Sequence, residues 1–228
     1  MATKKENTGS EIVSRFMRGF KRLLCDFSLK SKNGTNDYVS SLTLADMVQI
    51  KQDLSGINGI VTMLTEVAFV DKLEQKGLLD KTQHDGLIKE IRETSPYANG
   101  YDIRSKNPKI VAEVKCNCPI NEKSFGAKQI ELLIKDIKGL HDLSFKTKEG
   151  VSIDEHAHYN KFMVLLDSST LGNQHDFSTA VENLIAQLKR QDPEIDLEWF
   201  DKASIPLNHN TVYIVTVPLS NLELSILK

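Results

Sequence analysis

The sequence predicts a single α/β domain, with a central mixed β-sheet flanked by helices and an N-terminal helical segment. Apolar residues recur with helical period in several segments, short apolar or β-branched runs lie between them, and turn residues separate the two kinds of segment. The 228 residues are 40% hydrophobic and 26% charged, which is enough chain to bury a sizeable core. We expect residues 1–53 to form a helical segment packed on a core of residues 54–228.

The N-terminal segment predicts an amphipathic helix with one basic side. Its apolar stripe consists of Val13, Phe16, Phe20, Leu23, Leu24 and Phe27. On the opposite side, Arg15, Arg18 and Arg22 are candidate contacts for DNA phosphates. A solvated helix face is the alternative interpretation of the same arginines.

Residues 54–70 predict a helix that is apolar nearly all round and carries one ionisable side chain, Glu66. Glu66 lies opposite the main apolar stripe, yet Phe69, Val70 and Leu73 surround it on the helical wheel. A buried carboxylate is costly unless it is paired or binds a metal, so Glu66 is a candidate site residue. The alternative is a structural pair with a lysine or an arginine.

Residues 101–115 predict a β-hairpin that carries two acids and a lysine. Tyr101, Asp102 and Ile103 form its first strand, residues 106–109 its turn and residues 110–115 its second strand. Because side chains alternate along a strand, Glu113 and Lys115 share one face, and Asp102 can lie beside Glu113.

These three charged groups suit metal-dependent cleavage of a phosphodiester. Mg²⁺ takes oxygen ligands and typically one or two protein carboxylates, which leaves positions for water and phosphate, and Mn²⁺ favours similar ligands. The ammonium of Lys115 can orient the attacking water or stabilise charge on the phosphate. The alternative is an ordinary edge hairpin with charged residues on its wet face, because so short a motif also occurs by chance.

The elements after the hairpin alternate between helix and strand. Residues 126–139 predict an amphipathic helix, residues 161–166 a short apolar strand, and residues 211–217 a β-branched strand. Asp176 can cap a helix that continues to Leu188. Between residues 75 and 99, Leu87, Ile88 and Ile91 recur at helical spacing and no clear strand is visible.

Asp102 together with Glu113-Val114-Lys115 resembles the motif of the PD-(D/E)XK nucleases, the restriction-endonuclease-like superfamily, and the order of elements over residues 54–218 is similar. The resemblance implies a restriction-endonuclease-like core. It implies that Asp102, Glu113 and the carbonyl of Val114 bind the metal and that Lys115 positions the water. Glu66 would help through a second cation or a bound water.

The resemblance also suggests which residues face DNA. Asn117 directly follows the motif, and Lys128 and Gln129 begin the next helix, near the end of the sheet that meets DNA in this superfamily. A loop-capping role is the alternative for Asn117. The sequence departs from the family in having Gly100-Tyr101 where a proline often precedes the aspartate. It also lacks the Gln-x-x-x-Tyr of the exonuclease-like branch, which favours an endonuclease.

We therefore expect a Mg²⁺-dependent DNA endonuclease, most similar to type II restriction enzymes, that acts on double-stranded DNA as a homodimer. A repair, recombination or transposon endonuclease of the same fold is one alternative, and a non-catalytic nucleic-acid-binding protein is another. The net charge of -2 gives no global signature of DNA binding. A polar N-terminus and three cysteines predict a cytoplasmic protein, of prokaryotic type, with no membrane partner.

Two other groups of residues are alternative candidates for a site. Cys116, Cys118, His156 and His158 can each ligate zinc, but their spacing matches no structural zinc motif. The strand end at residues 165–172 can form a ligand loop, but it has neither a Walker lysine nor a dinucleotide glycine pattern.

Overall fold

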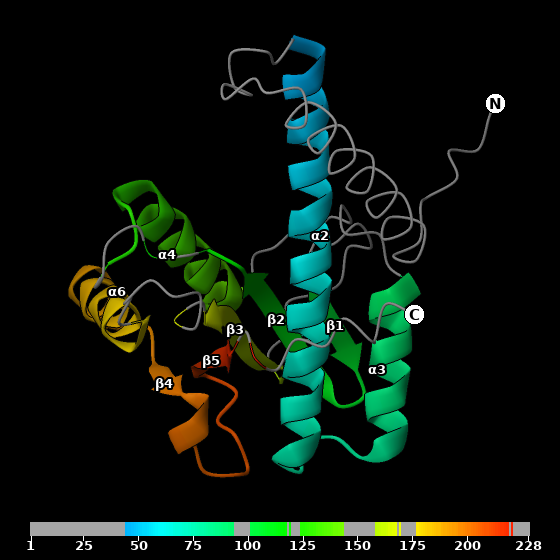
Figure 1. The fold of residues 1–228 in the computed structure, drawn as a ribbon. Helices are drawn as coiled ribbons and strands as arrows, with labels where there is room; N and C mark the ends of the chain where they lie inside the picture. The colour runs from blue at the N-terminus through cyan, green and yellow to red at the C-terminus, as the bar shows by residue number, and fades with distance from the viewer. Residues whose placement is uncertain are drawn as a thin grey trace, which may run out of the picture.

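The computed structural model describes residues 44–93, 101–117, 119, 124–143, 158–167, 169, 177–218 and 220, without the side chains of residues 46, 47 and 52–54. Two helices precede a β-hairpin, and helices and strands alternate in the rest of the described chain (Figure 1). The elements are α2 (Leu44–Gln75), α3 (Lys81–Glu93), β1 (Ile103–Lys106), β2 (Lys109–Lys115), α4 (Ala127–Asp142), β3 (Asn160–Asp167), α6 (Phe177–Gln191), β4 (Leu197–Trp199), the 3-10 helix η2 (Phe200–Lys202) and β5 (Val212–Pro218).

The strands form one mixed five-stranded sheet in the order β1-β2-β3-β5-β4. β1 is antiparallel to β2, whereas β2, β3, β5 and β4 are parallel to one another. The expected α/β class with a mixed sheet flanked by helices is thereby confirmed. Because parallel strands end at the same edge, the carboxyl ends of β2, β3 and β5 lie together.

Two hydrophobic cores cover the two faces of the sheet. On one face, Ala112 and Val114 of β2 belong to the core formed with α2 and α3. On the other face, Val111 belongs to the core formed with α4 and α6. Figure 1 shows α2 and α3 together and α4 and α6 together on the other side of the molecule. The alternation along β2 therefore turns Glu113 and Lys115 towards the face covered by α4.

Helix α2 is longer at both ends than the predicted 54–70. It ends where Gly77 adopts a positive φ of 75°, and the nitrogens of Gly77 and Leu78 donate to the carbonyls of Glu74 and Leu73 at 2.9 and 3.0 Å. At its other end, α2 runs across the expected boundary between residues 53 and 54. The arginines at positions 15, 18 and 22 lie outside the described residues.

The stretch Val48–Gln75 of α2 is long and apolar enough to cross a membrane by length and composition. Its second half instead packs on the sheet, where Phe69, Val70 and Leu73 are fully buried. Helix α2 therefore serves as a core helix of the α/β domain.

The hairpin differs in detail from the prediction. The first strand begins at Ile103 and not at Tyr101, and the turn consists of Asn107 and Pro108 alone, because Lys106 pairs with Lys109. Asp102 thus precedes the strand, and its side chain accepts a hydrogen bond from the backbone nitrogen of Val114.

Two further elements lie where no regular structure was predicted. β4 and η2 are three residues each, too short to show a period in the sequence. The residues that recur at helical spacing between positions 75 and 99 lie in α3, whose buried residues include Leu87 and Ile91. Asp176, the predicted cap of α6, lies outside the described residues.

Candidate active site

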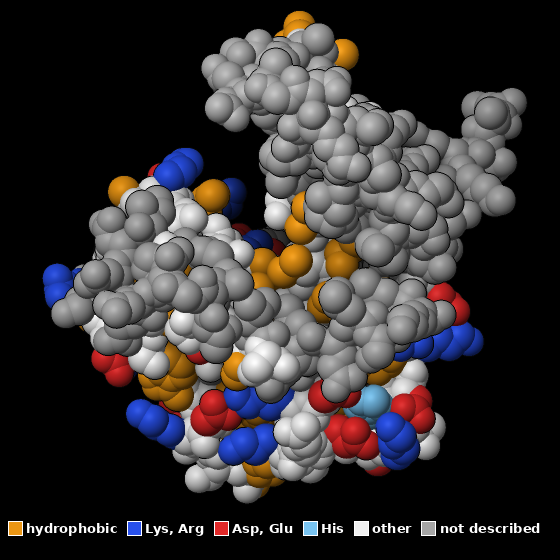
Figure 2. Space-filling view, in the orientation of Figure 1, with side chains coloured by type: hydrophobic (Ala, Val, Ile, Leu, Met, Phe, Trp, Pro, Cys, Tyr) orange, Lys and Arg blue, Asp and Glu red, His pale blue; other side chains and the backbone are white. Residues whose placement is uncertain are grey.

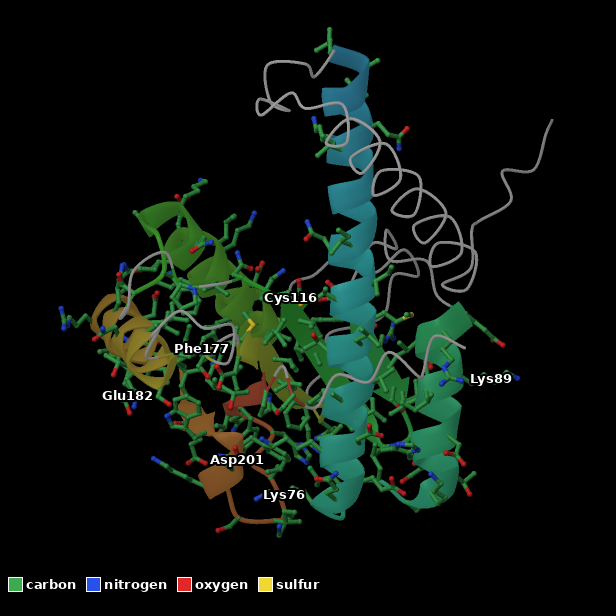
Figure 3. All side chains as sticks on the ribbon, viewed as in Figure 1. Lys76, Lys89, Cys116, Phe177, Glu182 and Asp201 are labelled. Atoms are coloured by element: carbon green, nitrogen blue, oxygen red, sulfur yellow. The ribbon has the colours of Figure 1, made fainter. Side chains whose placement is uncertain are left out.

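The charged residues of the hairpin meet at the carboxyl end of β2, between α2 and α4. Cys116, the residue after β2, is labelled in Figure 3, and its sulfur lies 3.8 and 3.5 Å from the hydroxyls of Thr62 and Thr65 on α2. Figure 2 shows basic and acidic side chains at the bottom of a hollow between α4 and α2.

Asp102 is fixed by the backbone of the neighbouring strand. Ile103 pairs with Ala112, so Asp102 stands opposite Glu113. The nitrogen of Val114 donates to Oδ2 of Asp102 at 2.7 Å. Asp102 is an exposed residue, yet desolvation of its carboxyl raises the pKa of Asp102 above 3.8, against the hydrogen bond from Val114 and the charge of Lys115.

Glu113 is a buried carboxylate that is satisfied at one oxygen only. The residue is 7% exposed. Its Oε1 accepts a hydrogen bond from Nζ of Lys115 at 2.7 Å, whereas Oε2 is buried and has no hydrogen-bond partner. Desolvation, followed by the charge of Asp102, raises the pKa of Glu113 from 4.5 to about 7, although Lys115 opposes the shift. An acceptor of this kind suits a proton or a cation.

Lys115 binds two carboxylates that come from different elements. Its Nζ lies 2.7 Å from Oε1 of Glu113 and 3.0 Å from Oδ2 of Asp136 on α4. Burial lowers the pKa of Lys115, but Glu113 and then Asp136 raise it more, so the net shift is upward from 10.5. The side chain therefore carries a positive charge at neutral pH.

Glu66 is the third acid of the group. It lies on α2 one residue after Thr65, and it is half-buried. Desolvation, the charge of Asp102 and the charge of Glu113 raise its pKa from 4.5 to about 9. Its charged neighbours among the described residues are thus acids and not the lysine or arginine of the alternative interpretation. The structure brings Glu66, Asp102, Glu113 and Lys115 together, as predicted.

The donor set suits a hard divalent cation. Asp102 and Glu113 offer carboxylate oxygens, one of them buried and without a partner, and Val114 lies between Glu113 and Lys115 in β2. Within the described ranges, no three or more His, Cys, Asp or Glu side chains form a ready-made metal cluster. Two carboxylates completed by water and phosphate oxygens match the way proteins usually bind Mg²⁺, which needs no third protein side chain.

The predicted DNA contacts have different surroundings. Asn117 is half-buried just after β2. Lys128 is exposed and forms an ion pair with Glu131 at 2.9 Å. Gln129 caps α4, because its Oε1 accepts a hydrogen bond from the nitrogen of Gly126 at 3.0 Å. Of these three residues, Lys128 is thus the one that presents a positive charge at the surface.

Asp136 is the site residue that the sequence did not reveal. It borders the apolar stripe of α4, next to Leu133 and Leu140, which are 1% and 0% exposed. A carboxylate beside such a stripe is a detectable signal, but the sequence does not show that its partner is Lys115.

Two of the four side chains of the zinc alternative, Cys116 and His158, are among the described residues. The thiol of Cys116 contacts Thr62 and Thr65 on α2, and exposed His158 lies beside His209, with ring centroids 6.2 Å apart. Cys118 and His156 lie outside the described residues.

Comparisons with known proteins found no match to a family model, to a curated protein or to a solved structure.

Proposed function

We propose that the protein is a Mg²⁺-dependent DNA endonuclease of the PD-(D/E)XK type, most similar to type II restriction endonucleases. The observation that carries the proposal is the buried, unpartnered Oε2 of Glu113 in a group with Asp102 and Glu66. Lys115 satisfies only Oε1 of Glu113, so the three neighbouring acids still favour protons or a divalent cation. Lys115 beside them supplies the positive charge that phosphodiester hydrolysis requires.

Each residue has a role that follows from its position. Asp102 and Glu113 would hold the metal together with the carbonyl of Val114. A bound Mg²⁺ supplies a Lewis acid and lowers the pKa of water. The charged ammonium of Lys115 orients the attacking water and stabilises negative charge on the phosphate. Glu66, whose pKa desolvation, Asp102 and Glu113 raise to about 9 in the metal-free protein, would help through a bound water or a second cation.

The substrate we propose is duplex DNA with a specific sequence. An enzyme that cuts both strands of a palindromic site is most simply a symmetric homodimer, because the two-fold axis of the protein then matches that of the site. A restriction enzyme of this type would act in the cytoplasm of a prokaryotic cell. An active, monodisperse monomer in analytical ultracentrifugation would contradict the dimer.

The test is cleavage of long unmethylated duplex DNA in Mg²⁺ and in excess chelator. We expect discrete fragments from the wild-type protein in Mg²⁺ only. Lys115→Ala should lower the cleavage rate at least about 100-fold, because it removes the charge at the reacting phosphate. Lys109→Ala is the matched control, since Lys109 is exposed at the other end of the same strand. It should cleave like the wild type.

Three results would contradict the proposal. Cleavage by Lys115→Ala at the wild-type rate, with an unchanged circular dichroism spectrum, would exclude the assigned site. DNA binding without cleavage, in Mg²⁺ or in Mn²⁺, would point to a non-catalytic binding protein. Cleavage of branched or mismatched DNA alone would indicate a repair or recombination endonuclease.

A further inference from the structure

Asp136, on helix α4, contacts the lysine of the candidate active site as a second carboxylate beside Glu113. Its Oδ2 lies 3.0 Å from Nζ of Lys115, and its side chain is 15% exposed. Helix α4 places Asp136 firmly, because Leu133, Ile137 and Leu140 of the same helix are buried in the core. The contact therefore joins a strand and a helix through two mostly buried side chains.

The charges of the site explain why a second carboxylate is needed. Without a cation, Glu113 alone could hold the ammonium of Lys115 at 2.7 Å. A divalent cation bound by Asp102 and Glu113 would neutralise the Glu113 carboxylate. The same cation would repel the ammonium of Lys115. Asp136 is the remaining carboxylate in contact with Lys115. It can keep the ammonium in place while Glu113 binds the metal.

We propose that Asp136 is a positioning residue, which holds the ammonium of Lys115 beside the reacting phosphate when Glu113 is occupied by the metal. This inference rests on the proposed nuclease function, but the contact itself can be tested without cleavage. Asp136→Asn keeps the size of the side chain and removes its charge. Asp142→Asn is the matched control, because it removes an exposed carboxylate from the last turn of the same helix.

The first measurement is reductive methylation of Lys115 in Mg²⁺, followed by mass spectrometry of the peptide. Asp136→Asn should make Lys115 react about 5-fold faster or more than in the wild type, because an ammonium released from the carboxylate 3.0 Å away is more mobile and more accessible to the reagent. Asp142→Asn should react at the wild-type rate. Equal protection of Lys115 in Asp136→Asn and in the wild type would overturn the proposal.

The second measurement is steady-state cleavage. Asp136→Asn should lower kcat about 10- to 100-fold and leave KM within about two-fold, because a misplaced catalytic group affects the reaction more than binding. Asp136→Glu should restore part of kcat. Wild-type kcat in Asp136→Asn would overturn the positioning role. If the wild-type protein cuts no DNA, the nuclease proposal fails, and the methylation result alone decides whether Asp136 holds Lys115.

Discussion

Glu66→Gln should stabilise the metal-free protein. Desolvation, Asp102 and Glu113 raise the pKa of Glu66 from 4.5 to about 9, so at pH 7 the folded protein holds a proton that the unfolded chain releases. For an acid with a raised folded pKa, stability is lost as pH rises above the unfolded value, and the loss is complete near the folded value. The window is therefore pH 4.5 to about 9. At pH 7 the loss is up to about 3 kcal/mol, at about 1.4 kcal/mol for each pH unit above the unfolded value.

The assay is urea unfolding at pH 5, 7 and 9 in excess chelator, so that no cation compensates the acids. Glutamine is neutral in both states, so Glu66→Gln should gain up to about 3 kcal/mol at pH 7 and show a shallower loss of stability with pH. Glu93→Gln, at an exposed position on α3, is the control and should change stability by less than about 0.5 kcal/mol. A variant no more stable than the wild type at pH 7, with the same pH dependence, would refute the reasoning.

Two predictions concern the helices that support the site. Gly77→Ala should lower the free energy of unfolding in urea by about 1 kcal/mol, because Gly77 has a φ of 75°. A Cβ at this position would meet no atom within 4 Å, so the loss comes from the backbone conformation alone. Unchanged stability would contradict this reasoning. Burial lowers the pKa of His84, but hydrogen bonds to Asp71 and Asp85 at 2.7 and 2.9 Å outweigh burial, so the net shift is upward from 6.5. Stability from this raised pKa is fully present below pH 6.5 and lost as pH rises through the folded pKa. His84→Gln should therefore cost on the order of 2 kcal/mol at pH 6 and less at pH 9, and an equal cost at both pH values would show that the charge of His84 contributes nothing.

The long periodic or β-branched segments were the most predictable parts of the fold. β3 contains all of the predicted strand 161–166, and β5 contains all but the first residue of the predicted strand 211–217. A short apolar run between turns is typical of a strand that is buried on both faces of a sheet. The start of β1 was wrong by two residues, since Asp102 bonds to the backbone of Val114 in place of a regular strand pair. β4 and η2 depend on tertiary contacts and not on a local period.

The candidate site was predictable where its residues are close in sequence. The alternation of side chains places Glu113 with Lys115, and the hairpin places Asp102 opposite them. Glu66 was visible as a lone carboxylate in an apolar helix. Asp136 was not visible, because its contact with Lys115 depends on how α4 crosses the sheet, and no spacing in the sequence encodes that angle.

The site is divided between a local hairpin and two helices on opposite faces of the sheet. Asp102 and Glu113 meet as soon as β1 and β2 pair, which requires only a two-residue turn. Glu66 and Asp136 join them only after α2 and α4 have both docked. A partly folded chain would thus bring Asp102 and Glu113 together but would lack Glu66 and the contact between Asp136 and Lys115. Under the proposed function, a nascent chain would remain harmless to its own cell's DNA until both layers of the domain are in place.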